Sequence, residues 1–140
     1  NRTAPHPSLM TFDCPDGNTT SIARQTSNTP LQALLTLNNN VFFDAARALA
    51  DRVLREAPDD DDARLAHLYR LCLARHPEPF EASALASLLA DARSAYQESD
   101  AGAREVAGKQ LTAERPSSEA AAWVTVARVV LNLDEFVTRE

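Results

Sequence analysis

Cys72 and His76 are the first candidates for chemistry, because a thiol and an imidazole four residues apart share one side of a helix. Such a pair can supply two ligands to zinc or combine a thiol nucleophile with its base. Zinc needs three or four ligands, and the other candidates are His67, Cys14 and His6. His67 lies about 140° around the helix from Cys72. No orienting group accompanies the pair, so we expect neither a metal site nor a nucleophile there.

A second polar group lies near the N-terminus, in a segment rich in proline and turn-forming residues. Asp13, Asp16 and Asn18 offer oxygens of the kind that calcium prefers, but they lack the closing glutamate of a calcium loop. We expect a turn with local side-chain hydrogen bonds, in which Arg24 pairs with Asp13 or Asp16 as a structural tie. The alternative is that Asp13, Asp16 and Arg24 complete an active site whose other residues lie in a preceding part of a longer chain.

The two cysteines, Cys14 and Cys72, are too few for a disulfide framework. Sequence leaves open whether they form one bridge, because the distance between them is not fixed by their positions in the chain. Without a bridge, Cys72 is expected to be a small core residue.

The elements that position these residues are expected to be helices. The chain has 140 residues, which fits one domain, and it contains 25 alanines and 17 leucines against a single isoleucine and 3 glycines. β-Branched residues, which favour strands, are scarce. The composition predicts an all-α fold, a compact bundle of about five helices. We expect residues 1–28 to form an extended arm that packs on a helical domain over residues 29–140.

Charge and hydropathy exclude two classes of partner. The chain carries 14 basic and 20 acidic residues, a net charge of −6, and no segment provides the basic face that phosphate binding requires. The longest strongly apolar stretch, residues 120–133, is too short to span a bilayer. We therefore expect no nucleic-acid partner and no membrane span in this segment.

Capping signals place the first expected helix. Thr29 is suited to the N-cap, Pro30 to the first helical position, and Gln32 completes a capping box. Asn38 lies in a run of three asparagines that interrupts the pattern, where one helix ends and another begins.

Apolar periodicity predicts the remaining helices. The acidic run 59–62 is interpreted as a solvated helix start and not as a calcium site. Asn132 and Glu135 have the spacing of another capping box, so we expect a break and restart before Phe136. The expected ranges are 41–56, 60–75 (ended by His76 and Pro77), 79–99, a marginal helix over 103–111, and a last helix from Ser117 or Ser118.

Several short motifs follow one another in a recognisable order. They are Phe12-Asp13-x-Pro15-Asp16, Arg24, Thr29-Pro30-Leu31-Gln32-Ala33-Leu34 with Leu37-Asn38, Leu68-Tyr69-Arg70-x-x-Leu73-Ala74-Arg75, Glu78-Pro79-x-Glu81, and Trp123 with Leu131-Asn132-x-x-Glu135-Phe136. With these motifs the sequence resembles, over about residues 11–138, the domain of unknown function 1553, also called the planctomycete PSD-one domain. It departs from the family pattern at Ala74, where glycine is common, at His76, often proline, and at Glu78, often a capping threonine.

The resemblance implies a context more than a mechanism. Such proteins commonly carry an upstream cytochrome-c-like haem domain and are expected outside the cytoplasm, in the periplasm or secreted. The chain begins at Asn1 without an initiator methionine, so we expect the C-terminal part of a longer protein. No cofactor is expected in this segment, although the parent protein could hold haem c.

The leading interpretation is a non-catalytic helical scaffold or interaction module, whose partners are other domains of its parent or another protein. The alternative is part of an enzyme site, acting on polysaccharide or in redox chemistry. A free-standing helical adaptor is a third possibility.

Overall fold

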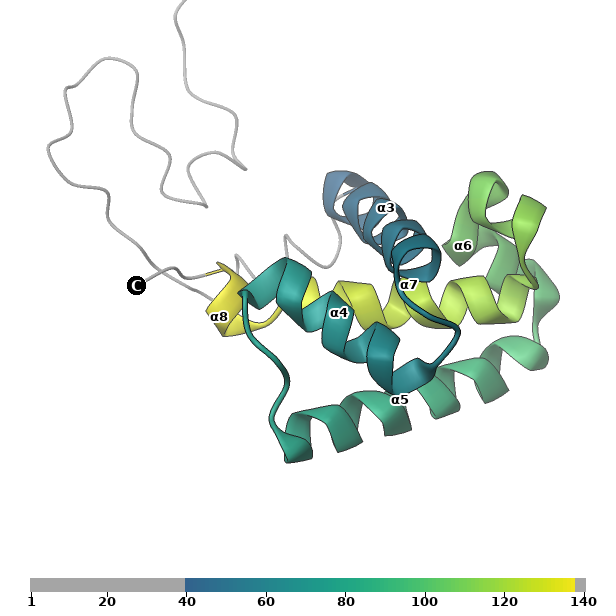
Figure 1. Cartoon of the computed structure of the whole chain (residues 1–140). Helices are drawn as coiled ribbons and strands as arrows, with labels where there is room; N and C mark the ends of the chain where they lie inside the picture. The colour runs from purple at the N-terminus through teal and green to yellow at the C-terminus, as the bar shows by residue number, and fades with distance from the viewer. Residues whose placement is uncertain (1–39, 138–140) are drawn as a thin grey trace, which may run out of the picture.

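The structure, a computed structural model, describes residues 40–137, which form six helices and no strand. This confirms the predicted all-α class. The predicted arm over residues 1–28 and the helix expected from Thr29 lie outside the described residues. The helices, labelled as in Figure 1, are α3 (Asn40–Glu56), α4 (Asp61–Leu73), α5 (Pro79–Gln97), α6 (Asp100–Glu114), α7 (Ser117–Leu131) and α8 (Asp134–Val137).

Helix α7 is the centre of the bundle. It runs between α5 on one side and α3 and α6 on the other, and it also contacts α4 and α8 (Figure 1). Trp123 is its largest fully buried side chain. Apolar residues at helical spacing predict one buried stripe, formed by Trp123, Val126, Ala127, Val130 and Leu131. In the structure α7 is buried on nearly all sides, because its alanines let several helices approach at once. Its buried residues are Ala120, Ala121, Ala122, Trp123, Val124, Val126, Ala127, Val130 and Leu131.

Helix α4 begins as the acidic run predicts but ends earlier than expected. The Asp60 side chain accepts a hydrogen bond of 2.8 Å from the Ala63 backbone N–H, and the first turn is acidic. The end predicted at His76 and Pro77 is wrong. The helix stops at Leu73, because Ala74 adopts a left-handed conformation with φ of 58° and donates its N–H to the Arg70 carbonyl.

Helix α6 is longer than the marginal helix predicted over residues 103–111. Its N-cap Ser99 accepts a hydrogen bond of 3.3 Å from the Gly102 N–H. Ala103, Ala107 and Leu111 are buried, and α6 packs on α7, so tertiary packing stabilises a helix with few large apolar residues. Gly108, with φ of 78°, breaks the helix internally.

The chain breaks between α7 and α8 where the sequence predicted it. Asn132 is the C-cap of α7, and its backbone N–H donates to the carbonyls of Arg128 and Val129. The predicted side-chain capping box is wrong, because the buried Asn132 Oδ1 accepts no hydrogen bond. The Glu135 carboxylate instead binds Arg75, which lies beyond the end of α4.

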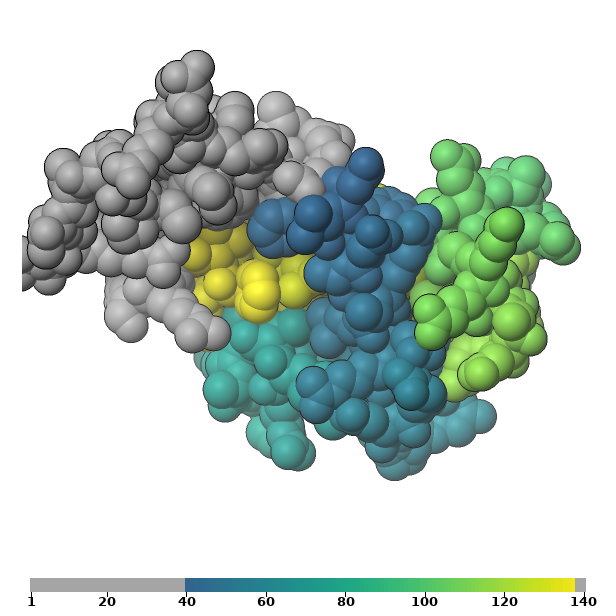
Figure 2. All heavy atoms as spheres, turned by 90° about the horizontal axis from the view of Figure 1, so that it is seen from above, coloured from purple at the N-terminus to yellow at the C-terminus, as the bar shows by residue number. Residues whose placement is uncertain are grey.

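The space-filling view shows α3 and α6 side by side with a notch between them (Figure 2). Within residues 40–137, no helix combines the length and the apolar character needed to cross a membrane.

Candidate functional site

Most of the residues singled out from the sequence lie outside the described part of the chain. Asn132 and Glu135 belong to the described part, where they have different roles. Asn132 ends α7, while Glu135 binds Arg75. The candidates outside the described residues are Asp13, Asp16, Arg24, Thr29, Gln32 and Asn38.

The structure does not support the helical spacing assumed for Cys72 and His76. Since α4 ends at Leu73, His76 lies beyond the helix that carries Cys72. Cys72 is a free, partly buried thiol, and burial raises its pKa to about 11, which keeps it protonated at neutral pH. His67 points elsewhere and contacts the Glu56 carboxylate at 2.9 Å. Within residues 40–137, no three histidine, cysteine, aspartate or glutamate side chains are arranged to hold a metal ion.

Arg75 is the centre of one ionic cluster. Its Nε and Nη2 donate to Glu135 over 2.8 and 2.6 Å, and its Nη1 and Nη2 donate to Glu81 over 2.8 and 2.9 Å. The Tyr69 ring lies 5.3 Å from the guanidinium carbon. The Glu78 backbone N–H also donates to Glu81, over 2.7 Å. The cluster joins the end of α4, the start of α5 and α8.

The charge of Arg75 stabilises the ionised form of its carboxylate partners. Hydrogen bonds from Arg75 and from the Glu78 backbone lower the pKa of Glu81 to about 2. Hydrogen bonds from Arg75 also lower the pKa of Glu135. Both carboxylates therefore stay ionised, and act as hydrogen-bond acceptors, at lower pH than an ordinary glutamate.

Arg93 forms a second cluster across three helices. It donates to Asp61 of α4 over 2.6 and 2.9 Å and to Glu119 of α7 over 2.7 and 2.6 Å. The indole Nε1–H of Trp123 also donates to Glu119, over 2.9 Å. These hydrogen bonds from Arg93 lower the pKa of both Asp61 and Glu119. The cluster joins α4, α5 and α7 through charge-assisted hydrogen bonds.

Arg47 performs a similar function between α3 and α6. Its Nε and Nη2 donate to the carbonyls of Val106 and Glu105 over 2.9 and 2.6 Å. Its Nη1 donates to Asp44 over 3.1 Å, and the Phe43 ring lies 4.3 Å from its guanidinium carbon. The arginine thus satisfies carbonyls at the end of the first half of α6, next to the break at Gly108.

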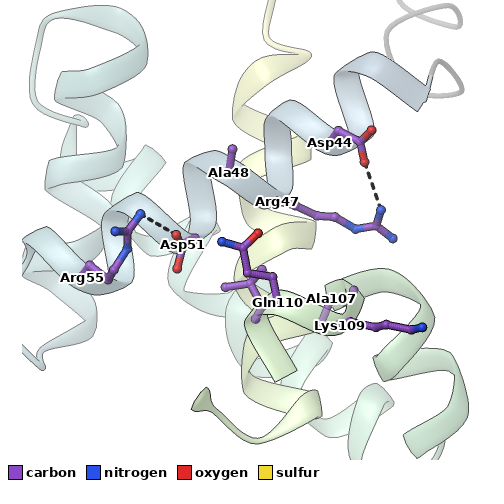
Figure 3. A pocket seen from close by; sticks show the side chains of 10 residues that line it. Asp44, Arg47, Ala48, Asp51, Arg55, Ala107, Lys109 and Gln110 are labelled. Carbon is purple, nitrogen blue, oxygen red and sulfur yellow. Dashed lines mark hydrogen bonds and ion pairs between the residues drawn. The ribbon is translucent and has the colours of Figure 1, made fainter. Parts of the chain in front are cut away.

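A hollow of about 490 Å³ lies beside Arg47, between α3 and α6. In Figure 3, Arg47 from α3 and Lys109 from α6 extend toward the same side, and Gln110 lies between the two helices. Arg55 and Asp51 form an ion pair at the other end (Figure 3). The residues that line the hollow are Asp44, Arg47, Ala48, Asp51, Arg55, Ala107, Gly108, Lys109, Gln110 and Leu111.

Within residues 40–137, the groups whose pKa values are shifted are poorly suited to proton transfer at neutral pH. A general acid or base works best with a pKa near the operating pH. The shifted carboxylates in residues 40–137 have lowered pKa values and the Cys72 thiol a raised one, so all of these move away from neutrality. Sequence reasoning missed Arg47, Arg75 and Arg93, because their partners lie on other elements; the one local signal was an isolated glycine, Gly108, inside a helical pattern.

Comparison with known proteins identifies the family of this chain. No curated protein matches the chain, and no solved structure matches it either. The family model described as PSD1, protein of unknown function (DUF1553), matches residues 1–89, which is more than half of the 140 residues. The matched region includes α3, α4 and the start of α5, with Arg47, Arg75 and Glu81. The chain therefore belongs to the DUF1553 family.

Proposed function

We propose that this chain is a non-catalytic helical interaction module of a multidomain extracytoplasmic protein, and that it docks on other domains of that protein or on a protein partner. One observation carries the proposal. Arg47, Arg75 and Arg93 each bind groups on at least one other element, so these charged residues serve to hold helices together. A bundle fixed in this way presents a rigid surface, and rigidity lowers the entropic cost of binding.

The setting of the module follows from the family resemblance. Planctomycete-type proteins of this kind commonly carry a cytochrome-c-like domain upstream, so the parent is proposed to hold haem c there and to act outside the cytoplasm. The parent gene tests both points. A C-x-x-C-H motif and an export signal upstream support the setting, and their absence from the complete reading frame contradicts it.

Removal of the module from its parent tests the docking function. We expect the parent without the 140 residues to bind the separately produced chain, with a measurable affinity in titration calorimetry. Failure to bind, together with unchanged fold and activity of the truncated parent, contradicts the proposal. If instead the deletion abolishes turnover of an identified substrate while the fold persists, and R24A and D13A variants of the whole parent do the same, the segment completes an enzyme site.

A further inference from the structure

The hollow between α3 and α6 has walls that are held in place. Arg47 ties α3 to the backbone of α6 through the carbonyls of Val106 and Glu105. Gly108 turns the chain at the rim, where a β-carbon would come within 3.3 Å of Arg47. Ala107 and Leu111 are almost fully buried beneath the opening. The hollow is therefore built by the fold and does not depend on one exposed side chain.

The charges around the hollow do not all cancel. Asp44 is paired with Arg47, and Asp51 is paired with Arg55. Lys109 remains, and within residues 40–137 its ammonium group makes no ion pair. Lys109 is also the single lysine of a chain whose net charge is −6. The Gln110 amide extends toward α3 on the side of Asp51 and Arg55, away from the Lys109 ammonium group (Figure 3), so Lys109 is the group available to a carboxylate.

The geometry points to this hollow as the docking site for an acidic side chain that lies next to an aliphatic one on the partner polypeptide. The inference rests on the proposed function, because it names where the interaction module binds and what it recognises. The carboxylate binds Lys109, and the aliphatic side chain contacts Ala48 and the apolar floor formed by Ala107 and Leu111.

Size and charge argue for one carboxylate and against a polyanion. A volume of about 490 Å³ is in the ordinary range for a small ligand site and accommodates one or two side chains. Polyphosphates and nucleic acids require several uncommitted cations, whereas here two arginines already bind aspartates. A single lysine matches a single carboxylate, with binding that weakens as ionic strength rises.

Peptide titration of the isotope-labelled 140-residue chain tests the inference by nuclear magnetic resonance. The probe is a capped tetrapeptide, glycine–glutamate–leucine–glycine, and the matched probe has glutamine in place of glutamate. We expect saturable shifts at the backbone amides of residues 108–111 with the glutamate peptide, and binding at least about fivefold weaker with the glutamine peptide. K109Q should weaken binding of the glutamate peptide by a similar factor, while K109R should retain it.

The control variant is R70Q, which removes one positive charge from an exposed position on α4, away from the hollow. It should bind like the wild-type chain. Equal binding of the two peptides, equal binding by K109Q, or shifts located elsewhere overturns the inference. The proposed function is judged separately by binding to the truncated parent: binding that K109Q leaves unchanged rejects the hollow and keeps the module, whereas absence of any binding rejects the module itself.

Discussion

A β-carbon on Gly108 would lie 3.3 Å from Nε of Arg47. The glycine therefore leaves room for the Arg47 side chain beside the end of the first half of α6. The same glycine has φ of 78° and ψ of 164°, a region that is accessible essentially to glycine alone. One residue therefore provides both the turn of the backbone and the space for the side chain that caps it. Both residues line the hollow between α3 and α6.

Substitution of this glycine, G108A, should lower the free energy of unfolding by about 1–3 kcal/mol, because alanine is strained in this conformation and crowds Arg47. Urea denaturation measures the change. The matched control is G102A, since Gly102 has helical geometry; its β-carbon would lie 3.1 Å from the Ser99 Oγ, so the Ser99 side chain has to shift slightly. G102A should change the free energy of unfolding by less than about 1 kcal/mol, because the gain in helix propensity is opposed by this contact with the cap. Equal losses in the two variants would contradict the role of Gly108.

At Ala74 the reverse substitution, from alanine to glycine, should stabilise the fold. It is exposed and holds φ of 58° at the end of α4, a left-handed conformation that costs a residue with a β-carbon about 1 kcal/mol. A74G should therefore raise the free energy of unfolding by about 0.5–1 kcal/mol, measured by urea denaturation. A74S keeps the β-carbon and should give no such gain; a gain with serine, or a loss with glycine, would show that the strain is not what limits stability here.

Local signals predicted the helices well, but they missed the end of α4 and the extent of α6. The start of α4 in the acidic run and the break at Asn132 follow from residue type and neighbours, which the sequence displays directly. The end of α4 did not follow, because Ala74 adopts a conformation that alanine disfavours and that only the surrounding structure imposes. The length of α6 depends on its burial against α7, and this contact between distant segments cannot be read from any short stretch of the sequence.

The candidate site was less predictable than the fold for a similar reason. Arg93 binds a residue 32 positions before it and another 26 positions after it. Glu135 was expected to pair with Asn132 nearby and instead binds an arginine 60 positions away. Helical spacing identifies neighbours within one helix, whereas these contacts depend on how helices cross. The predicted N-terminal motif lies outside the described residues and stays a prediction.

Removal of the Arg93 guanidinium should weaken the contact of α4 and α7 with α5. R93Q leaves Asp61 and Glu119 without their shared cation, so we expect a loss of about 1–2 kcal/mol in the free energy of unfolding. Trp123 fluorescence should also change, because its indole hydrogen bond goes to Glu119. R104Q is the control, since Arg104 forms an exposed pair within α6 and should cost less than about 0.5 kcal/mol. Similar costs for the two variants would contradict a structural role for the cluster.

Cys72 should react slowly with thiol reagents. Its pKa is raised from 9.0 to about 11 by burial, which lowers the thiolate fraction near pH 8 by about a hundredfold. In a C14S variant, iodoacetamide labelling followed by mass spectrometry should show slow modification in buffer and fast modification in denaturant. Rapid labelling of the folded chain at the rate of a free cysteine peptide would show that the thiol is activated, and would reopen a reactive role for it.

Acid should loosen the Arg75 cluster. The folded pKa of Glu81 is lowered to about 2 from 4.5, so the stability that its charge contributes is present above pH 4.5 and is lost as the pH falls toward 2. Glu135, with its pKa lowered by Arg75, contributes in the same direction. We expect the urea concentration at the midpoint of unfolding to fall as the pH is lowered from about 5 to about 2.5. E81Q should be less stable at pH 7, and its midpoint should fall less steeply with acid. E98Q removes the same charge at the end of α5, outside the cluster, and should keep the wild-type slope. An unchanged slope in E81Q would mean that the Arg75 cluster does not link this fold to pH.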